Sequence, residues 1–210
     1  MAHPIHELTD LLSELPGVGP RQARRIVQFF LRKNGAFRSD VAERIVNLSK
    51  SVFQCPSCFR FDEGTIKGPC SLCKDSSRDP KTLMVVEKDV DIEGVEASNA
   101  YRGRYFVLGG LLPLARQRKN AGNVRTKELL ARIQKNLPAP AGGQAGGITE
   151  IIFALATTPE GDFTAHEIAK EIKTLNSELL VTLLGRGLSV GAEIEYADQE
   201  TLRNALKNRA

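Results

Sequence analysis

The four cysteines of this chain lie within one short segment, and their spacing is that of a metal-binding site. In "CPSCFRFDEGTIKGPCSLC", eleven residues separate two Cys-x-x-Cys pairs. Each pair can present two thiolates to one ion, and four thiolates complete the tetrahedral shell that Zn²⁺ prefers. Such a closed shell leaves no position for a substrate. We therefore predict a structural zinc site formed by Cys55, Cys58, Cys70 and Cys73.

The alternatives for these cysteines are disulfide bonds or a redox-active dithiol. The N-terminus, "MAHPIHELTD", lacks the basic and then apolar layout of a secretory signal peptide. No apolar run approaches the ~20 residues of a membrane span. We therefore expect a cytoplasmic protein with no membrane partner, and disulfides are rare in that compartment. A redox dithiol needs one Cys-x-x-Cys pair rather than two, which favours zinc.

A second candidate site is "LPGVGPRQARR", which separates two stretches whose apolar residues have helical spacing. Gly17 and Gly19 allow a tight turn and remove Cβ atoms that would keep another backbone at a distance. The turn precedes a helix N-terminus, which favours anions, and Arg21 and Arg25 share one face of that helix. The pattern favours contacts to DNA phosphates irrespective of base sequence. The alternative is a plain helix corner with solvated arginines.

The elements expected around these sites change in character along the chain. Helices are predicted over residues 5–14 and 21–33, and a third helix is predicted to begin with Asp40 as its cap. From residue 81 onward, the strands "TLMVVE", "RYFVLGG", "EIIFALAT" and "ELLVTLL" alternate with the helices "DIEGVEAS", "TKELLARIQ" and "TAHEIAKEIKTL". This order predicts a mainly parallel sheet covered by helices. The tail is expected to end in a short helix.

Composition indicates a folded and mildly basic protein. Its 210 residues, 41% hydrophobic and 26% charged, are enough for a buried core. The net charge of +4 does not by itself indicate nucleic acid. A basic stretch over residues 116–135 contains one acid, Glu128, and both a solvated helix face and a strip contacting phosphates stay open. Its basic residues are Arg116, Arg118, Lys119, Arg125, Lys127, Arg132 and Lys135.

In this order, the segments resemble the RecR family of bacterial recombination mediators. "LPGVGPRQARR" is similar to its helix-hairpin-helix, and "VVEKDVDIEGVE" and "YRGRYFVLGGLLPL" are similar to the start of its Toprim domain. "TPEGDFTAHEIA" resembles its second acidic motif, and "GRGLSVGAEIEYADQETLRNAL" resembles its C-terminal segment. The resemblance covers nearly the whole chain. Against the family pattern, residues 137–147, "LPAPAGGQAGG", look like an insertion and are expected to form a surface loop.

The resemblance implies an α+β protein of several domains. A helix-hairpin-helix region would occupy residues 1–52, and a four-cysteine zinc finger would occupy residues 53–77. An α/β Toprim domain with a mainly parallel sheet would follow over residues 78–178. A C-terminal oligomerisation segment of strand and helix would complete the chain over residues 179–210.

The resemblance also implies a non-enzymatic protein of DNA recombination and repair. It would bind single- and double-stranded DNA without sequence preference and would associate with the nucleoid in the cytoplasm. It would act with RecO, and in many bacteria with RecF, to help load RecA onto single-stranded DNA. Family members form ring-like tetramers through their N-terminal regions and exchanged C-terminal segments. Arg21 and Arg25 fall on the positions where the family carries DNA-contacting basic residues.

Three acids match the acidic motifs of that family's Toprim domain. Glu87 ends the first predicted strand, and Glu160 and Asp162 lie in "PEGD". The resemblance implies that these acids lie near the RecO-binding surface, and Mg²⁺ binding stays open beside a role as helix caps or solvated loop acids. The neighbouring "DVD", residues 89–91, follows the strand directly and predicts a helix start.

Two other classes of function stay open from the sequence. One is a Toprim enzyme such as a metal-dependent nuclease, and the other is a protein-only scaffold that docks partners through the zinc site and the hairpin. Phosphoryl transfer would need acids that hold Mg²⁺ and, in a topoisomerase, a tyrosine nucleophile. Tyr101 and Tyr105 flank the start of a strand, where packing is the expected role, and Tyr196 has no base near it in sequence. We predict no catalytic residue.

Overall fold

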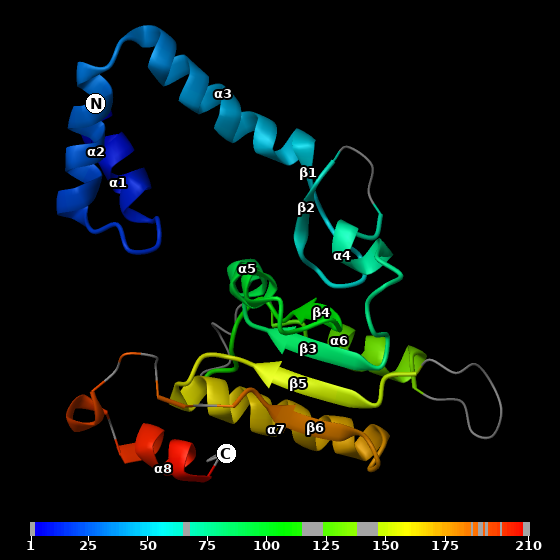
Figure 1. Ribbon diagram of the computed structural model, residues 1–210. Helices are drawn as coiled ribbons and strands as arrows, with labels where there is room; N and C mark the ends of the chain where they lie inside the picture. The colour runs from blue at the N-terminus through cyan, green and yellow to red at the C-terminus, as the bar shows by residue number, and fades with distance from the viewer. Residues whose placement is uncertain are drawn as a thin grey trace. The chain divides into compact units, whose positions relative to one another are not determined.

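The chain forms two compact units, Met1–Val52 and Phe53–Ala210, in the computed structural model (Figure 1). The domain boundaries predicted at residues 77/78 and 178/179 stay predictions. No helix of the described residues is long and apolar enough to cross a membrane. The structure describes residues 3–64, 68–114, 124–137, 147–185, 187–188, 191, 193–197 and 199–207.

The first unit is built from three helices, α1 (Pro4–Ser13), α2 (Pro20–Arg32) and α3 (Gly35–Ser51). Helices α1 and α2 pack against each other, and Ala23 and Val27 of α2 are buried. These two residues are four apart, so they form the apolar stripe that the sequence pattern predicts. The opposite side of α2 is left free for its charged residues.

The start of α3 differs from the prediction. The helix begins at Gly35, ahead of the apolar run that suggested Asp40 as its cap. Asn34 is the cap instead, because its Oδ1 accepts a hydrogen bond from the Phe37 N–H at 2.9 Å. Asp40 lies inside the helix and forms an exposed ion pair with Arg44 at 2.9 Å.

The second unit contains a four-stranded parallel sheet, as predicted. Its strands are β3 (Thr82–Val86), β4 (Arg104–Val107), β5 (Glu150–Ala154) and β6 (Leu180–Leu183), in the order β4-β3-β5-β6. The connecting helices are α5 (Asp89–Ser98), α6 (Thr126–Lys135) and α7 (Pro159–Leu175). After β6 come a 3-10 turn (Ile194–Tyr196) and α8 (Gln199–Lys207).

Helices cover both faces of this sheet, as a parallel sheet requires. On one face, alternate strand residues such as Leu83 and Phe153 pack with Leu129 and Ile133 of α6 and Ile168 of α7. The other face is narrower and packs mainly with Ile92 of α5 (Figure 1). The core is therefore centred on β3, of whose five residues four are buried.

The cysteine segment folds as a small module that the sequence pattern did not resolve into elements. It contains a two-stranded sheet, β1 (Val52–Gln54) and β2 (Phe61–Glu63), and a short helix, α4 (Ser71–Lys74). Phe59, next to a cysteine, has a left-handed backbone with φ 62°, and its ring lies 5.4 Å from that of Phe106. The module is thus packed on the sheet of the second unit.

A buried arginine joins the end of this module to the sheet. Arg78 donates to the Gly103 carbonyl at 3.0 Å and forms an ion pair with Glu96 of α5. The other oxygen of Glu96 accepts from the Tyr105 hydroxyl at 2.5 Å. Burial raises the pKa of Tyr105 well above its usual range by desolvation, helped by this carboxylate. The phenol therefore stays protonated and keeps donating.

Gly161, in the first turn of α7, is required by a close backbone approach. A Cβ at this position would lie 1.9 Å from the Ala156 carbonyl oxygen. We expect Gly161→Ala to destabilise the protein by about 2 kcal/mol, since the backbone must move to accept the methyl group. The measurement is the free energy of unfolding in urea.

Gly94→Ala is the matched control, because Gly94 lies inside α5 with nothing within 4 Å of the added Cβ. Here helix propensity alone acts, and we expect a gain of about 0.5–1 kcal/mol. Equal effects at the two positions would contradict the role given to the close approach.

Candidate metal centre and nucleic-acid interface

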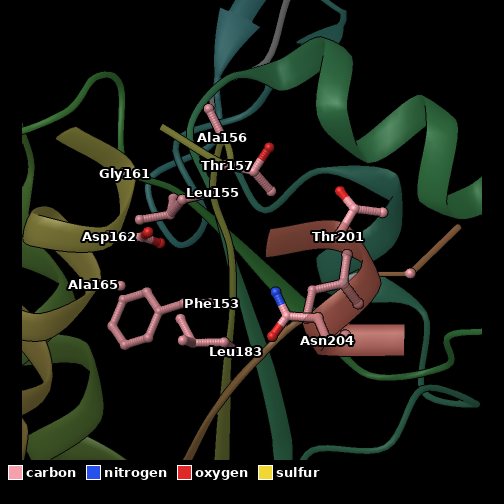
Figure 2. Close-up of a pocket in the computed structure, with 13 residues that line it drawn as sticks. Phe153, Leu155, Ala156, Thr157, Gly161, Asp162, Ala165, Leu183, Thr201 and Asn204 are labelled. Carbon is pink, nitrogen blue, oxygen red and sulfur yellow. The ribbon is translucent and has the colours of Figure 1, made fainter. Parts of the chain in front are cut away.

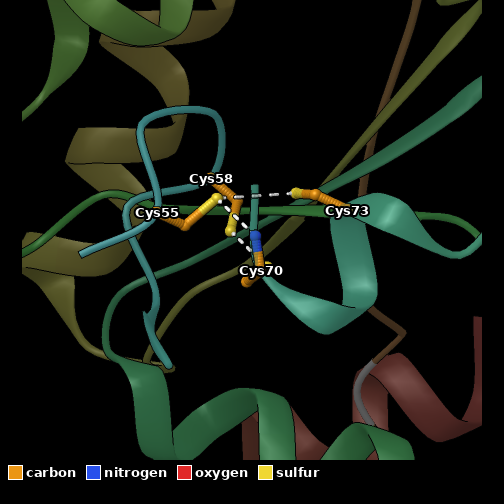
Figure 3. A group of neighbouring side chains, drawn as sticks. All are labelled: Cys55, Cys58, Cys70 and Cys73. Atoms are coloured by element: carbon orange, nitrogen blue, oxygen red, sulfur yellow. Dashed lines mark hydrogen bonds between the residues drawn. The ribbon is translucent and has the colours of Figure 1, made fainter. Parts of the chain in front are cut away.

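The four cysteine sulfurs converge on one point of the module, as the zinc prediction requires. They lie within 4.8 Å of one another, and Cys55, Cys58 and Cys70 are buried (Figure 3). Tetrahedral zinc with Zn–S bonds of about 2.3 Å needs sulfurs about 3.8 Å apart. The Cys55–Cys73 and Cys58–Cys70 sulfur distances are 3.9 Å and 3.4 Å. The donor set and its size therefore fit one zinc ion.

Local structure presents these sulfurs. Cys55 and Cys58 lie in the turn between β1 and β2, which is closed by the hydrogen bond from the Phe59 N–H to the Cys55 carbonyl at 2.9 Å. Cys70 caps α4, and its N–H donates to the Cys55 sulfur at 3.3 Å.

The packed thiols also shift one another's ionisation. The hydrogen bond shared with Cys58 lowers the pKa of Cys70 and raises the pKa of Cys58. A cluster without metal thus holds its protons unevenly, whereas a coordinated metal keeps all four sulfurs as thiolates. In the described part of the chain, these cysteines form the one group of at least three His, Cys, Asp or Glu side chains close enough to share an ion.

The hairpin residues lie at the junction of α1 and α2. Gly17 has φ +76°, a conformation that glycine adopts without strain. Gly19 has extended backbone and is the N-cap of α2, which no side chain caps. Gly19 therefore acts by leaving the N-terminus of α2 open, and no positive φ is required of it. The first N–H groups of α2 have no partner within the helix, as at every helix start, so they are available to an anion.

Arg21 and Arg25 are both exposed on α2. Among the residues that the structure describes, no carboxylate forms an ion pair with either one. Ala23 and Val27 hold the opposite face of the helix against α1. The arrangement leaves two guanidinium groups beside an uncapped helix N-terminus, a site suited to phosphate.

The three acids predicted from the sequence, Glu87, Glu160 and Asp162, are not gathered into a metal cluster among the described residues. Glu87 follows β3 and pairs with Lys88 at 3.1 Å. Glu160 and Asp162 lie in the first turn of α7, where the helix dipole stabilises negative charge. The positions of these acids fit a role in stabilising helix starts at least as well as a role in binding Mg²⁺. Asp91, in "DVD", caps α5 by accepting from the Lys88 N–H at 2.8 Å, so that prediction is confirmed.

A cavity of about 490 Å³ lies beside the second acidic motif, and no sequence pattern indicated it (Figure 2). It is formed where β5 ends, α7 begins and α8 passes. Asp162 borders it together with Thr157, and α8 contributes Thr201 and Asn204. The C-terminal helix is thus placed opposite the acidic turn.

The basic stretch over residues 116–135 is not uniformly solvated. Arg116, Arg118 and Lys119 lie outside the described residues, as do residues 138–146 of the segment 137–147. Arg125 and Arg132 are partly buried, and Arg132 donates to two backbone carbonyls. The sequence carried a signal for Arg132, because it lies three residues after the buried Leu129 and so on the inner side of the helix.

Known proteins match this chain along almost its entire length. Residues 81–184 match the Toprim domain family, and residues 187–210 match the RecR C-terminal family. Recombination protein RecR of Bdellovibrio bacteriovorus is 34% identical over 206 residues, or 98% of this chain and 96% of that protein. The RecR proteins of Methylocella silvestris and Paenarthrobacter aurescens are 37% and 35% identical, again over 98% of this chain and over 94% and 95% of their own lengths.

The metal prediction is testable by elemental analysis. We expect one zinc ion per chain, lost in Cys70→Ser, with a fall of several degrees in the thermal unfolding midpoint because the module has little apolar mass of its own. Since the ligands must be thiolates, affinity for zinc should fall as the pH is lowered. Ser71→Ala, next to the same cysteine, is the control. Purified wild-type protein without metal would contradict the site.

Proposed function

Because this chain belongs to the RecR family of recombination proteins, we propose that it acts in recombination repair as a DNA-binding mediator without catalysis. The observation that carries the proposal is the start of α2, where Arg21 and Arg25 stand exposed beside an uncapped helix end. Groups of this kind contact the sugar-phosphate backbone and do not distinguish bases. The proposed substrate is therefore DNA, single- or double-stranded, of any sequence.

The proposed partners follow from the family. The chain would act with RecO, and with RecF where it is present, to help load RecA onto single-stranded DNA in the cytoplasm, on the nucleoid. Glu87, Glu160 and Asp162 would lie near the RecO-binding surface. Zinc is the proposed resident metal of the four cysteines. Mg²⁺ at the three acids is not part of this proposal, because the described residues do not bring them together.

A ring-like homotetramer is supported by apolar side chains that a monomer would leave in water. In the first unit, Ile45 and Val46 of α3 are each 63% exposed. In the second unit, Leu183 is 57% exposed and Leu184 is 51% exposed, at the end of β6, which has a strand partner on one side only among the described strands. Exposed apolar groups and an unpaired strand edge are features that association with further chains removes.

The DNA-binding proposal predicts a change in salt dependence. Arg21→Ala with Arg25→Ala should weaken DNA binding, and the slope of log affinity against log salt should become shallower by about 0.9 for each phosphate that the protein no longer neutralises. Gel-shift titration at several salt concentrations measures both. The matched control is Arg32→Ala with Lys50→Ala, which removes the same charge from exposed positions away from the turn.

If the two double variants weaken DNA binding equally, net charge alone explains the effect. That result would contradict the role given to the turn. A wild-type affinity for DNA that does not change with salt would favour the protein-only scaffold. The same labelled DNA should stay intact with Mg²⁺ or Mn²⁺. Cleavage that Glu87→Gln abolishes would assign the protein to the Toprim nucleases instead.

The ring proposal predicts a solution mass of four times the chain mass of 23.0 kDa. Ile45→Glu with Val46→Glu should lower that mass, because carboxylates would be buried in an apolar contact. Light scattering after size-exclusion chromatography measures it. A monomer at micromolar concentration would contradict the tetramer. A mass that the substitutions leave unchanged would contradict the role of this α3 surface in the assembly.

A further inference from the structure

Strand β4 lies at one edge of the four-stranded sheet, so one side of its backbone has no partner among the described strands. An uncovered edge leaves N–H and C=O groups unpaired and invites pairing with other chains. Here outward groups of Tyr105 and Val107 in β4 are bonded to other parts of the chain. The Val107 N–H donates to the Cys58 carbonyl at 2.8 Å, and the Tyr105 carbonyl accepts from Arg132.

Arg132 joins this edge to the cysteine module through a single nitrogen. Its Nη1 donates to the Tyr105 carbonyl of β4 at 2.8 Å and to the Ser57 carbonyl, between the first two cysteines, at 2.7 Å. The guanidinium carbon lies 5.9 Å from the centre of the Phe106 ring. The strand, the module and α6 therefore meet at this one side chain.

The charge of Arg132 also suits this place. Four thiolates and one divalent ion carry a net charge of about −2 beside it. Burial lowers the pKa of Arg132, while the sulfurs of Cys73 and Cys58 act in the opposite direction. Arg104 is a second guanidinium close enough to lower it further. Two neighbouring cations are best accommodated where a negative cluster lies against them.

Lys135, which lies one turn after Arg132 in α6, makes no comparable contacts among the described residues. Lys135 is exposed, and no described residue forms an ion pair with it. Both residues belong to the basic stretch that the sequence offered as a strip for phosphate contacts. The Nη1 of Arg132 is instead used within the chain, where it donates to two backbone carbonyls, so Arg132 is a joint of the fold and not a residue of such a strip.

We propose that Arg132 is the positioning residue that clamps the first Cys-x-x-Cys pair to the edge of the Toprim sheet. Retention of the metal ion and coverage of β4 then depend on each other. When the clamp is removed, the Ser57–Cys58 backbone moves away from β4, and the pair of sulfurs that it carries leaves the metal more easily. This inference rests on the proposed zinc site and is independent of the DNA interface.

The test compares Arg132→Met, which keeps an unbranched apolar stem, with Lys135→Met, which removes the same charge one helical turn away. Zinc release from the full chain to a coloured chelator is followed in time. We expect Arg132→Met to release zinc at least about tenfold faster than wild type, since two hydrogen bonds from a charged donor are removed. Lys135→Met should match wild type.

Amide hydrogen exchange supplies a local readout. The Val107 N–H bonds to the module, whereas the Leu108 N–H bonds to the Val86 carbonyl inside the sheet at 2.8 Å. Removal of the clamp should accelerate exchange at Val107 and leave Leu108 protected. Exchange that accelerates equally at both amides would mean general destabilisation and would overturn the proposal.

Arg132→Lys keeps the charge but lacks the planar guanidinium fork. This variant tests the clamp if Arg132→Met does not fold. Its zinc release should be faster than wild type, with Val107 exposed before Leu108. Release at the wild-type rate in the Arg132 variants would overturn the clamp alone. Wild-type protein that binds no zinc would overturn the metal site and the clamp together.

Discussion

The fold depends on the need of a parallel sheet to bury both of its faces. Strand β3 is buried at four of its five positions, so both of its faces must be covered, and α5, α6 and α7 in the connections between strands supply this cover. The carboxyl ends of β3 and β5 consequently meet at one edge, which brings Glu87 and the acidic turn of α7 to the same side. The sheet thus sets where these acids lie, although it does not gather them around an ion.

Burial separates two classes of arginine in this protein. Arg21 and Arg25 are exposed at a helix start and have their donors available to a ligand. Arg78 and Arg132 direct theirs to backbone carbonyls and to a carboxylate within the second unit. A guanidinium group offers five donors in a rigid fork, so the same residue type serves as a contact for phosphate or as a joint between elements. Which role it takes depends on the packing around it.

The parts that sequence predicted best are those set by local pattern. Apolar runs such as "TLMVVE" located the strands, and cysteine spacing located a four-cysteine cluster that could hold a metal ion. The predicted start of α3 was wrong because an apolar run does not locate the capping residue, and Asn34 lies well before that run. The close approach that requires Gly161 and the cavity next to α8 depend on how the backbone turns and on which distant parts of the chain meet. No local pattern encodes such contacts.

Phe59 bears on the order in which the second unit assembles. A left-handed backbone costs a residue with a side chain about 1–2 kcal/mol. The contacts that offset this cost are the Phe106 ring and the Arg125 guanidinium, 5.1 Å from the Phe59 ring, and both belong to the sheet and its connections. Packing on the sheet therefore helps the turn around the first cysteine pair to reach its final shape. The cysteine module would be a poor autonomous folding unit, and its maturation on the nascent chain would wait for residues far downstream to leave the ribosome.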